Sequence, residues 1–360
     1  MSLSEVRIKD VRNIKSAHLI PSPKLNLLVG PNGSGKTSFL EAIYLLSRAR
    51  SFRTHNIKKV INSEESNLLV FAKLDHTGVK NKIAIKKDPQ ETTIRINDKT
   101  EKKSSELNRF FHAHLIRPES QVLLESGSSL RRSFVDWGVF HVEHAFLDAS
   151  KKYNHTLKQR NKLLKSKQLD TLDVWSDKLA EYGIMITAHR ERYVLQLEAA
   201  LCLIAADLIG EIVINVEYIK GWDKGLSYDQ ALKKALARDL QYGHTTIGSH
   251  KSDVRVLVDG RLAQDYLSRG QMKLLIIALY LAQIKLMRDQ GKKSICVLLD
   301  DLASELDGVN FNKVMLFLVG LDIQMFVTTT DESLFGDYVS DKASRVFHVK
   351  HGRVIKGDDE

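Results

Sequence analysis

Eight residues near the start of the chain read Gly30-Pro31-Asn32-Gly33-Ser34-Gly35-Lys36-Thr37. They match the phosphate-binding pattern G-x-x-x-x-G-K-[ST] without a gap. The apolar run 25–29 before them predicts a strand, and the apolar spacing within 39–46 predicts a helix. Glycines let successive backbone N–H groups surround phosphate oxygens, while Lys36 bridges the β- and γ-phosphates and Thr37 offers its hydroxyl to Mg²⁺. The stretch therefore predicts a nucleoside triphosphate site.

The composition is that of a soluble globular protein: 360 residues, 43% hydrophobic and 27% charged. This length predicts two or three domains, or one large domain with an insertion. The longest apolar run, 274–282, is shorter than the roughly 18 residues of a membrane-spanning helix, and residues 1–5 lack the pattern of a signal peptide. These two features predict no membrane partner. Cys202 and Cys296 lie far apart, and Cys296 falls in an apolar strand, which predicts reduced thiols in a cytoplasmic protein.

Positive charge exceeds negative charge, with a formal net charge of +10. Residues 151–167 contain basic side chains and no acidic one, so nothing local neutralises them. Such a run is usually a solvated helix face, but a run of a single sign also fits phosphate contacts in nucleic acid. The residues expected to contact DNA are Lys151, Lys152, Lys158, Arg160, Lys162, Lys165 and Lys167.

The order of patterns predicts an α/β head, a mixed β-sheet with flanking helices, interrupted by a coiled-coil-like helical arm. A hairpin is expected in 3–20, connected by 10–16, and further strands in 68–98. A heptad seam from Leu172 to Tyr193 predicts a long helix packed on helices of 130–165. The expected domains are an N-terminal head part (1–125), the arm (126–209) and a C-terminal head part (210–360).

The apolar run 295–299 ends in Asp300 and Asp301. This pattern is typical of a buried strand that carries a carboxylate to its C-terminal edge, beside a phosphate loop. Asp300 is expected to hold Mg²⁺, directly or through water, and Asp301 to polarise the attacking water.

The segment Leu267-Ser268-Arg269-Gly270-Gln271 opens the helix that leads to this acidic strand. Ser268 is a natural N-cap, and its N–H group and that of Gly270 favour an anion. The phosphate loop, this segment and the acidic strand together resemble ABC-type ATPases, in which L-S-x-G-Q binds the γ-phosphate held by a second subunit. The resemblance implies ATP and Mg²⁺ as ligands, contacts from Ser268, Gly270 and Gln271 to the partner's nucleotide, and an ATP-dependent homodimer. Residues 304–307 match the loop that contacts the partner.

Five segments (11–14, 131–140, 248–253, 267–275 and 299–307) resemble the RecF family, bacterial recombination mediators with an SMC-like ATPase head. The resemblance covers essentially the whole chain. It implies a weak ATPase that binds DNA in an ATP-dependent manner and acts in replication, recombinational repair and the SOS response. Such a protein binds single- and double-stranded DNA, preferentially at gaps, and loads RecA together with RecR and RecO. Arg12 and Asn13 are carried over as nucleotide contacts.

Three departures from the ABC pattern alter the expected chemistry. Asp301 stands where a Glu is usual, and its shorter reach predicts slow hydrolysis. A threonine, Thr330, takes the place of the histidine expected after the later strand. No glutamine clearly matches the one that senses the metal in the ABC pattern. Glu119 and Gln121 are both candidates for this position, and Gln121 is equally well an ordinary loop residue.

Other proteins share parts of this pattern. The ATPase subunit of a membrane transporter has the same loop, signature and acidic strand, but needs neither a heptad arm nor a basic segment. The ATPases of double-strand-break nucleases carry much longer coiled coils with a Cys-x-x-Cys zinc hook, whereas this chain has two separated cysteines. A metabolic kinase does not need L-S-x-G-Q. The transporter subunit remains the alternative interpretation.

Overall fold

The computed structural model describes residues 2–76, 78–117, 122–291, 295–339 and 343–355. The chain packs as two compact units, and each is described by itself. Unit 1 comprises residues 1–120 and 291–360, and unit 2 comprises residues 121–290. The interruption of one unit by the other agrees with the expected insertion.

Unit 1 contains an antiparallel sheet in the order β2-β1-β4-β5-β6-β7. The turn between β1 and β2 consists of Arg12 and Asn13, so the connection is shorter than the sequence predicts; Arg12 has a φ of 53°. Side chains on one face of β1, β2, β4, β5 and β6 enter the core, which gives the sheet one apolar face. The strands are β1 (Ser2–Val11), β2 (Ile14–Leu19), β4 (Leu68–His76), β5 (Val79–Lys87), β6 (Thr92–Ile96) and β7 (Lys99–Glu101).

A second sheet of unit 1 has the order β15-β14-β3-β13-β12-β8, parallel except for β15. Its central strands β3, β12 and β13 are buried along their whole length because both faces of the sheet are covered, and most of their residues are apolar. The strands are β3 (Leu25–Val29), β8 (His112–Ile116), β12 (Ile295–Leu299), β13 (Gln324–Thr329), β14 (Ser344–Lys350) and β15 (Arg353–Ile355). The helices are α1 (Lys36–Arg48), α9 (Gly308–Gly320) and α10 (Gly336–Val339), with 3₁₀ turns at Ile57–Lys59, Ser104–Arg109, Leu302–Ser304 and Ser333–Phe335.

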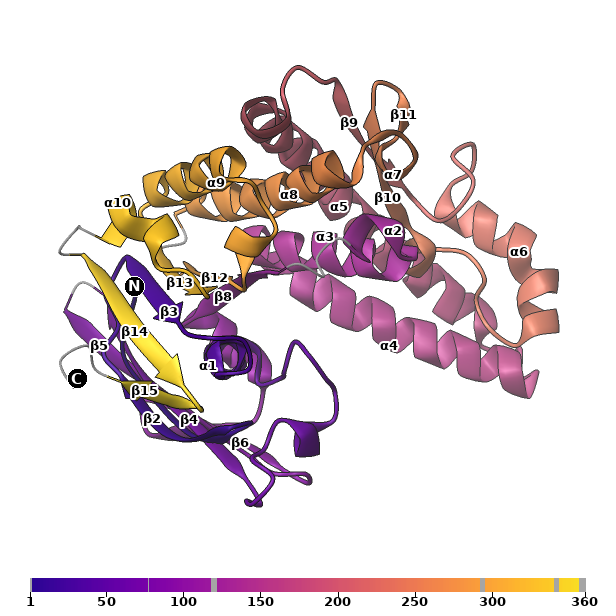
Figure 1. The fold of residues 1–360 in the computed structure, drawn as a ribbon. Coiled ribbons are helices and arrows are strands. Elements are labelled where there is room, and N and C mark those ends of the chain that lie inside the picture. Colours follow the sequence, from indigo (N-terminus) through magenta and orange to yellow (C-terminus); the bar gives the residue numbers. More distant parts are fainter. Residues whose placement is uncertain (1, 77, 118–121, 292–294, 340–342, 356–360) are drawn as a thin grey trace. The chain divides into compact units, whose positions relative to one another are not determined.

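Helix α1 packs between the two sheets of unit 1 (Figure 1), and its apolar side chains share one core with both of them. Strand β3 pairs with β13 and β14, which follow it by some three hundred residues. The phosphate loop therefore leaves the centre of a parallel sheet at the carboxyl end of β3, the usual position for a ligand site in such sheets.

Unit 2 is mostly helical and carries the small sheet β11-β10-β9. Helices α4 and α5 pack together as predicted, and Lys167, with a φ of 57°, ends α4 before the turn. The heptad residues Leu172, Leu179, Ile186 and Tyr193 are all buried. The elements are α2 (Val122–Glu125), α3 (Ser128–Val142), α4 (His144–Ser166), α5 (Leu172–Ile209), β9 (Ile214–Ile219), α6 (Tyr228–Tyr242), a 3₁₀ turn (Ser249–Lys251), β10 (Asp253–Val258), β11 (Arg261–Leu262), α7 (Ala263–Tyr266) and α8 (Arg269–Asp289).

Residues 210–290 pack with the arm, whereas the sequence groups them with the head. The reason is that β9 and α8 both pack along α5, the long helix of the arm. Within this contact the side-chain amide of Gln283 donates to the Tyr193 hydroxyl, 3.1 Å away. The L-S-x-G-Q segment thus belongs to unit 2.

Helix α8 is the one helix of the described residues that is long and apolar enough to cross a membrane. Sixty-seven per cent of its most apolar window is buried inside the structure, as in a core helix. Its apolar character is accounted for by its packing in unit 2.

Candidate active site

The glycine loop of unit 1 has a conformation that only small residues allow. Gly33 and Gly35 have φ values of 78° and 112°, in the left-handed region that favours glycine. A Cβ at Gly30 would lie 2.3 Å from the Val349 carbonyl oxygen, so this position cannot carry a side chain without moving β14. The loop then enters α1 at Lys36, three residues before the helical segment 39–46 that the sequence predicts.

The loop offers unused hydrogen-bonding groups to an anion. Helix α1 has no side-chain cap at its N-terminus, where backbone N–H groups and the helix dipole favour negative charge. The Ser34 hydroxyl is buried and has no hydrogen-bond partner. Lys36 Nζ donates to the carbonyls of Gly30 (2.6 Å) and Pro31 (3.1 Å). Together these groups fit a phosphate chain.

Burial lowers the pKa of Lys36, and the nearby carboxylates of Asp301 and Asp300 oppose this shift. The side chain therefore lies in a partly desolvated position with two negative groups close by. A cation in such a position gains from the arrival of phosphate oxygens, because their charge replaces lost hydration.

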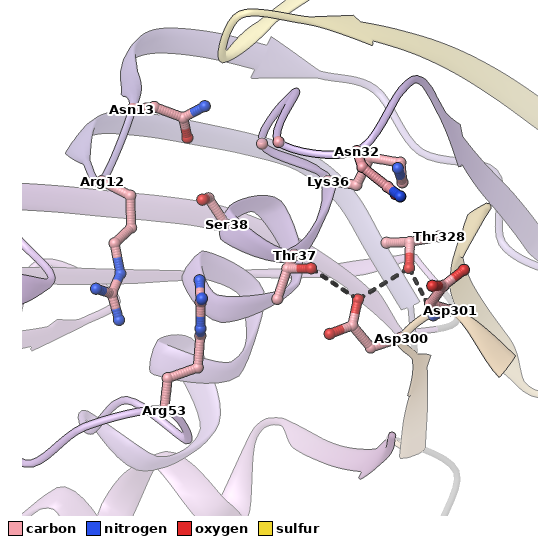
Figure 2. Close-up of a pocket in the computed structure, with 12 residues that line it drawn as sticks. Arg12, Asn13, Asn32, Lys36, Thr37, Ser38, Arg53, Asp300, Asp301 and Thr328 are labelled. Carbon is pink, nitrogen blue, oxygen red and sulfur yellow. Dashed lines mark hydrogen bonds between the residues drawn. The ribbon is translucent and has the colours of Figure 1, made fainter. Parts of the chain in front are cut away.

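Asp300 is at the centre of a hydrogen-bonded cluster (Figure 2). Its Oδ1 accepts from Thr37 Oγ1 and from Thr328 Oγ1, each at 2.9 Å. These residues come from α1 and from the ends of β12 and β13, neighbouring parallel strands. Mg²⁺ prefers one or two carboxylate or hydroxyl ligands from the protein and takes the rest from phosphates and water. Thr37 and Asp300 fit this requirement and would hold the ion beside the loop.

Asp301 differs from Asp300 in its backbone. Its φ of 50° is left-handed, and its N–H donates to Thr328 Oγ1 at 2.9 Å. This kink turns the chain from β12 into the 3₁₀ turn Leu302–Ser304 and directs two adjacent carboxylates differently (Figure 2). A strained residue at a strand end is a common feature of reaction centres.

A cavity of about 390 Å³ collects these groups. Of the predicted residues it is lined by Arg12, Asn13, Asn32, Gly33, Gly35, Lys36, Thr37, Asp300 and Asp301. Three further residues line the cavity and are not among the predicted site residues: Ser38, Arg53 and Thr328. Thr328 belongs to the same threonine run as Thr330, but Thr330 is exposed and Thr328 is the one that contacts the carboxylate. Glu119 and Gln121 lie outside the described residues.

Arg12 is held by a buried acid on α1. Glu41 is fully buried and accepts from Arg12 Nε and from a terminal guanidinium nitrogen of the same residue, each at 2.8 Å. Ser51 Oγ also donates to Glu41 and accepts from the N–H of Arg53 at 2.9 Å. One carboxylate therefore positions Arg12 and the loop of Arg53, which lie to the same side of Thr37 in Figure 2.

The turn between β14 and β15 supports the glycine loop from behind. Gly352 N–H donates to the Ser34 carbonyl at 2.7 Å, and Asn13 Nδ2 donates to the same carbonyl at 3.3 Å. The dipeptide His351-Gly352 is the sequence signal for this turn, since both residues have positive φ values. Nothing in the local sequence indicates that the turn contacts the loop.

The L-S-x-G-Q segment has the predicted helix start. Ser268 is the N-cap of α8: its Oγ accepts from Gln271 N–H at 3.3 Å, and Gln271 Oε1 accepts from Ser268 N–H at 3.1 Å. Ser268, Gly270 and Gln271 are all exposed. Asp307 caps α9 in the same way, accepting from Asn310 N–H at 2.9 Å.

Two further motifs singled out in the sequence contact each other in unit 2. Arg131 donates to both carboxylate oxygens of Asp253, at 2.8 and 2.9 Å, and Arg132 donates to the Ser252 carbonyl at 2.7 Å. Arg190 joins the same cluster through two bonds to Asp136, at 2.6 and 2.8 Å. These arginines are structural, because their donors are directed at carboxylates and carbonyls of neighbouring elements.

The basic run of the arm divides into two groups. Lys151, Lys158, Lys162 and Lys165 are exposed and follow helical spacings of three, four and seven on α4. Lys152 and Lys167 are also exposed, and Lys152 pairs with Asp148. The expectation that Arg160 contacts DNA is wrong. It is 1% exposed and donates to Asp239 (2.8 Å) and Thr245 (2.7 Å), so its guanidinium is not available to DNA.

Comparisons with known proteins agree on one family. Residues 2–355 match the model described as RecF/RecN/SMC N terminal domain. The chain is 40% identical to the DNA replication and repair protein RecF of Shewanella baltica (strain OS185) over 356 residues, which are 98% of this chain and 99% of that protein.

Solved structures give the same result. The chain matches a structure of the recombination mediator protein RecF-ATP in the RecFOR pathway, with 27% identity and a TM-score of 0.87 over 99% of this chain and 97% of that one. An SMC head bound to the C-winged helix domain of ScpA shares the fold, with 13% identity and a TM-score of 0.61, covering 99% of this chain and 98% of that one. The chain therefore belongs to the RecF family of DNA replication and repair proteins, which have an SMC-type ATPase head.

Proposed function

We propose that the protein is a DNA-binding ATPase that binds ATP and Mg²⁺ and closes as a dimer on DNA. The observation that carries the proposal is the cluster of Thr37, Asp300 and Thr328 beside the uncapped start of α1. Such a cluster suits a triphosphate and its metal together. The relative whose structure is described as RecF-ATP supports ATP as the ligand.

Each residue of the site has a role in this scheme. Lys36 releases the loop carbonyls and donates to the β- and γ-phosphates. A Mg²⁺ ion held by Thr37 and Asp300 would supply further charge neutralisation there. Asp301 accepts a proton from the attacking water, and its short side chain accounts for slow hydrolysis. Thr328 holds the Asp300 carboxylate towards Thr37.

The proposed dimer uses two motifs of the chain, the phosphate loop 30–37 and the L-S-x-G-Q segment 267–271. We assign Ser268, Gly270 and Gln271 to the γ-phosphate bound by the partner, so that ATP joins two copies head to tail. Their exposure supports this assignment. Slow hydrolysis then releases the dimer from DNA.

The trans arrangement predicts complementation between two inactive variants. Lys36→Arg loses ATP binding and Ser268→Arg blocks contact with the partner's phosphate, so neither variant alone dimerises or hydrolyses ATP. A mixture forms heterodimers with one intact composite site and recovers part of the activity. Light-scattering mass and ATPase rate are measured with and without ATP. Dimers of both single variants, or no recovery on mixing, would contradict the scheme.

For DNA we assign the exposed lysines of α4. Each phosphate contact contributes about −0.9 to the slope of log affinity against log salt concentration. Lys158, Lys162 and Lys165 replaced by Gln therefore reduce the slope for duplex DNA by about 2–3, and an unchanged slope would remove the arm from the interface. By its relationship to RecF of the RecFOR pathway, we propose RecR and RecO as partners, gapped DNA as the preferred structure and RecA loading as the outcome.

A further inference from the structure

The antiparallel sheet of unit 1 buries one face and exposes the other. Val6, Ile8, Val70, Ile83 and Ile94 belong to the core. The alternate positions of the same strands point to the opposite face. They include a group of basic residues, together with the acids Glu5 and Asp75 and the uncharged residues Leu69, Phe71, Ala84 and Thr93. The array consists of Arg7, Lys9, Lys73, Lys82, Lys86 and Arg95 and is called the basic sheet face below.

Strand register arranges these side chains in rows across the sheet. Arg7, Phe71, Ala84 and Arg95 are successive cross-strand partners on β1, β4, β5 and β6. Lys9, Leu69 and Lys86 form the next row, two residues further along. With strands about 4.8 Å apart and residues about 3.4 Å apart, the array measures about 14 Å in each direction.

The charge of the basic sheet face is only partly balanced. Glu5 lies within it and pairs with Arg7 and Lys73, each at 2.6 Å. Its pKa is lowered to about 2, mainly by the hydrogen bond from Lys73, so Glu5 stays ionised at neutral pH. Lys82 is 3.4 Å from Asp98 and Lys9 is 3.9 Å from Asp10.

The other two basic residues, Lys86 and Arg95, form no such close pair, although the charge of Lys86 contributes to lowering the pKa of Asp88. Among the described residues, no carboxylate lies within 4 Å of Lys86 or Arg95. Lys73 and Lys82 are direct cross-strand partners, and like charges placed opposite one another reduce the stability of a sheet. The array thus concentrates positive charge on one face of the sheet.

From this geometry we propose that the basic sheet face binds the phosphate backbone of duplex DNA, as a second contact surface besides the arm lysines. The proposal rests on the DNA-binding function proposed above. A duplex carries one negative charge per about 1.7 Å of axis, so 14 Å contains roughly eight phosphates, and those on one side of the duplex can face the array.

The apolar residues on this face favour a duplex over a single strand. Single-strand binding uses exposed aromatic rings on which bases stack. The aromatic residue of these rows is Phe71, and the Arg7 guanidinium lies over its ring, 5.8 Å from the centroid. The uncharged residues that complete the two rows are Ala84, Leu69 and Thr93, and none of them provides a stacking surface.

The test replaces Lys9, Lys86 and Arg95 by Gln in one chain. These residues make no contact to Glu5, so the pairs to Arg7 and Lys73 remain. Affinity for a 30-base-pair duplex is measured by fluorescence anisotropy over a range of salt concentrations. The slope against log salt should fall by about 2–3 units, with a smaller change for a single strand of the same length. Melting temperature and ATP affinity should stay at their native values.

A matched control removes three charges elsewhere, with Lys224, Lys233 and Lys234 of unit 2 replaced by Gln. It should keep the native slope. If the sheet variant also keeps the native slope while the arm variant loses it, the basic sheet face is not a DNA surface and the proposed function stands. If the sheet variant and the control lose the same amount, the effect is one of net charge and the inference fails. If the native chain does not bind DNA at all, both fail.

Discussion

The nucleotide cavity of unit 1 and the arginine clusters of unit 2 are both rich in polar groups, but they differ in how far those groups are satisfied. In the cavity, the Ser34 hydroxyl has no partner and Lys36 is held only by carbonyls of its own loop. In unit 2, Arg160 and Arg190 donate to carboxylates and hydroxyls that the fold supplies. Unused bonding capacity therefore marks the place for a ligand, and saturated bonding marks a structural role. Changes in the two regions should separate binding from stability.

The largest effect on stability is expected for Arg160→Ala, in the arginine clusters of unit 2. Loss of the guanidinium leaves the fully buried Asp239 carboxylate without its ion pair. Breaking such a pair lowers the free energy of unfolding by about 3–5 kcal/mol, measured by urea denaturation, while ATP affinity stays native. The double variant Arg160→Met, Asp239→Leu should recover much of the loss. Reduced DNA affinity with unchanged stability would instead restore Arg160 as a DNA contact.

His250 makes the same region sensitive to pH. Its Nε2 is 3.1 Å from the Thr245 carbonyl and its Nδ1 is 2.8 Å from the Tyr153 hydroxyl. Burial lowers its pKa from 6.5 to about 4, so between these values the unfolded chain binds the additional proton. Stability should therefore fall as the pH drops from about 6.5 to 4, by about 3 kcal/mol in all. Denaturation of His250→Asn should lack this loss, and an identical pH profile would show that other groups cause it.

In the nucleotide cavity, where hydrogen-bonding groups are unused, Gly352→Ala should weaken ATP binding. The new Cβ would lie 2.2 Å from the Asn13 carbonyl oxygen, at a φ of 74°, and would displace the turn that holds Ser34. We expect the free energy of unfolding to fall by about 1–3 kcal/mol. The melting temperature measures this loss, and titration calorimetry measures the weaker binding of ATP. Gly260→Ala is the control, because its φ is 76° but nothing lies within 4 Å. If both variants bind ATP with native affinity, the turn does not support the loop.

The smallest effect on stability is expected at Ser268, whose hydroxyl caps α8 and is also assigned to the partner's phosphate. Ser268→Ala removes the cap of α8 and should reduce stability by about 1 kcal/mol. Ser268→Asp keeps a capping oxygen and should keep the stability, but its charge repels a phosphate and should abolish the ATP-dependent dimer. Melting curves and light scattering measure the two effects. A dimer that survives in Ser268→Asp would limit Ser268 to its capping role.

The sequence predicts the parts of the site that are contiguous in the chain. The loop 30–37, the acidic strand end at Asp300 and the cap at Ser268 each follow from local rules of spacing, burial or capping. The wrong expectation for Arg160 has a physical reason: a run of like charges gives no indication of which helix positions face inward. The contact between Arg131 and Asp253 spans 122 residues, and that between Gly352 and Ser34 depends on strand order. No local pattern encodes such pairings.

The position of β3 also governs when the site comes into existence during synthesis. This strand and its loop leave the ribosome early, but both strands that flank it, β13 and β14, come from the last tenth of the chain. At about 5–20 residues per second, the loop waits on the order of 15–60 s for its neighbours. A chain that lacks β13 and β14 thus has the phosphate-binding sequence without the sheet that shapes it, and the site forms only after both strands have been synthesised.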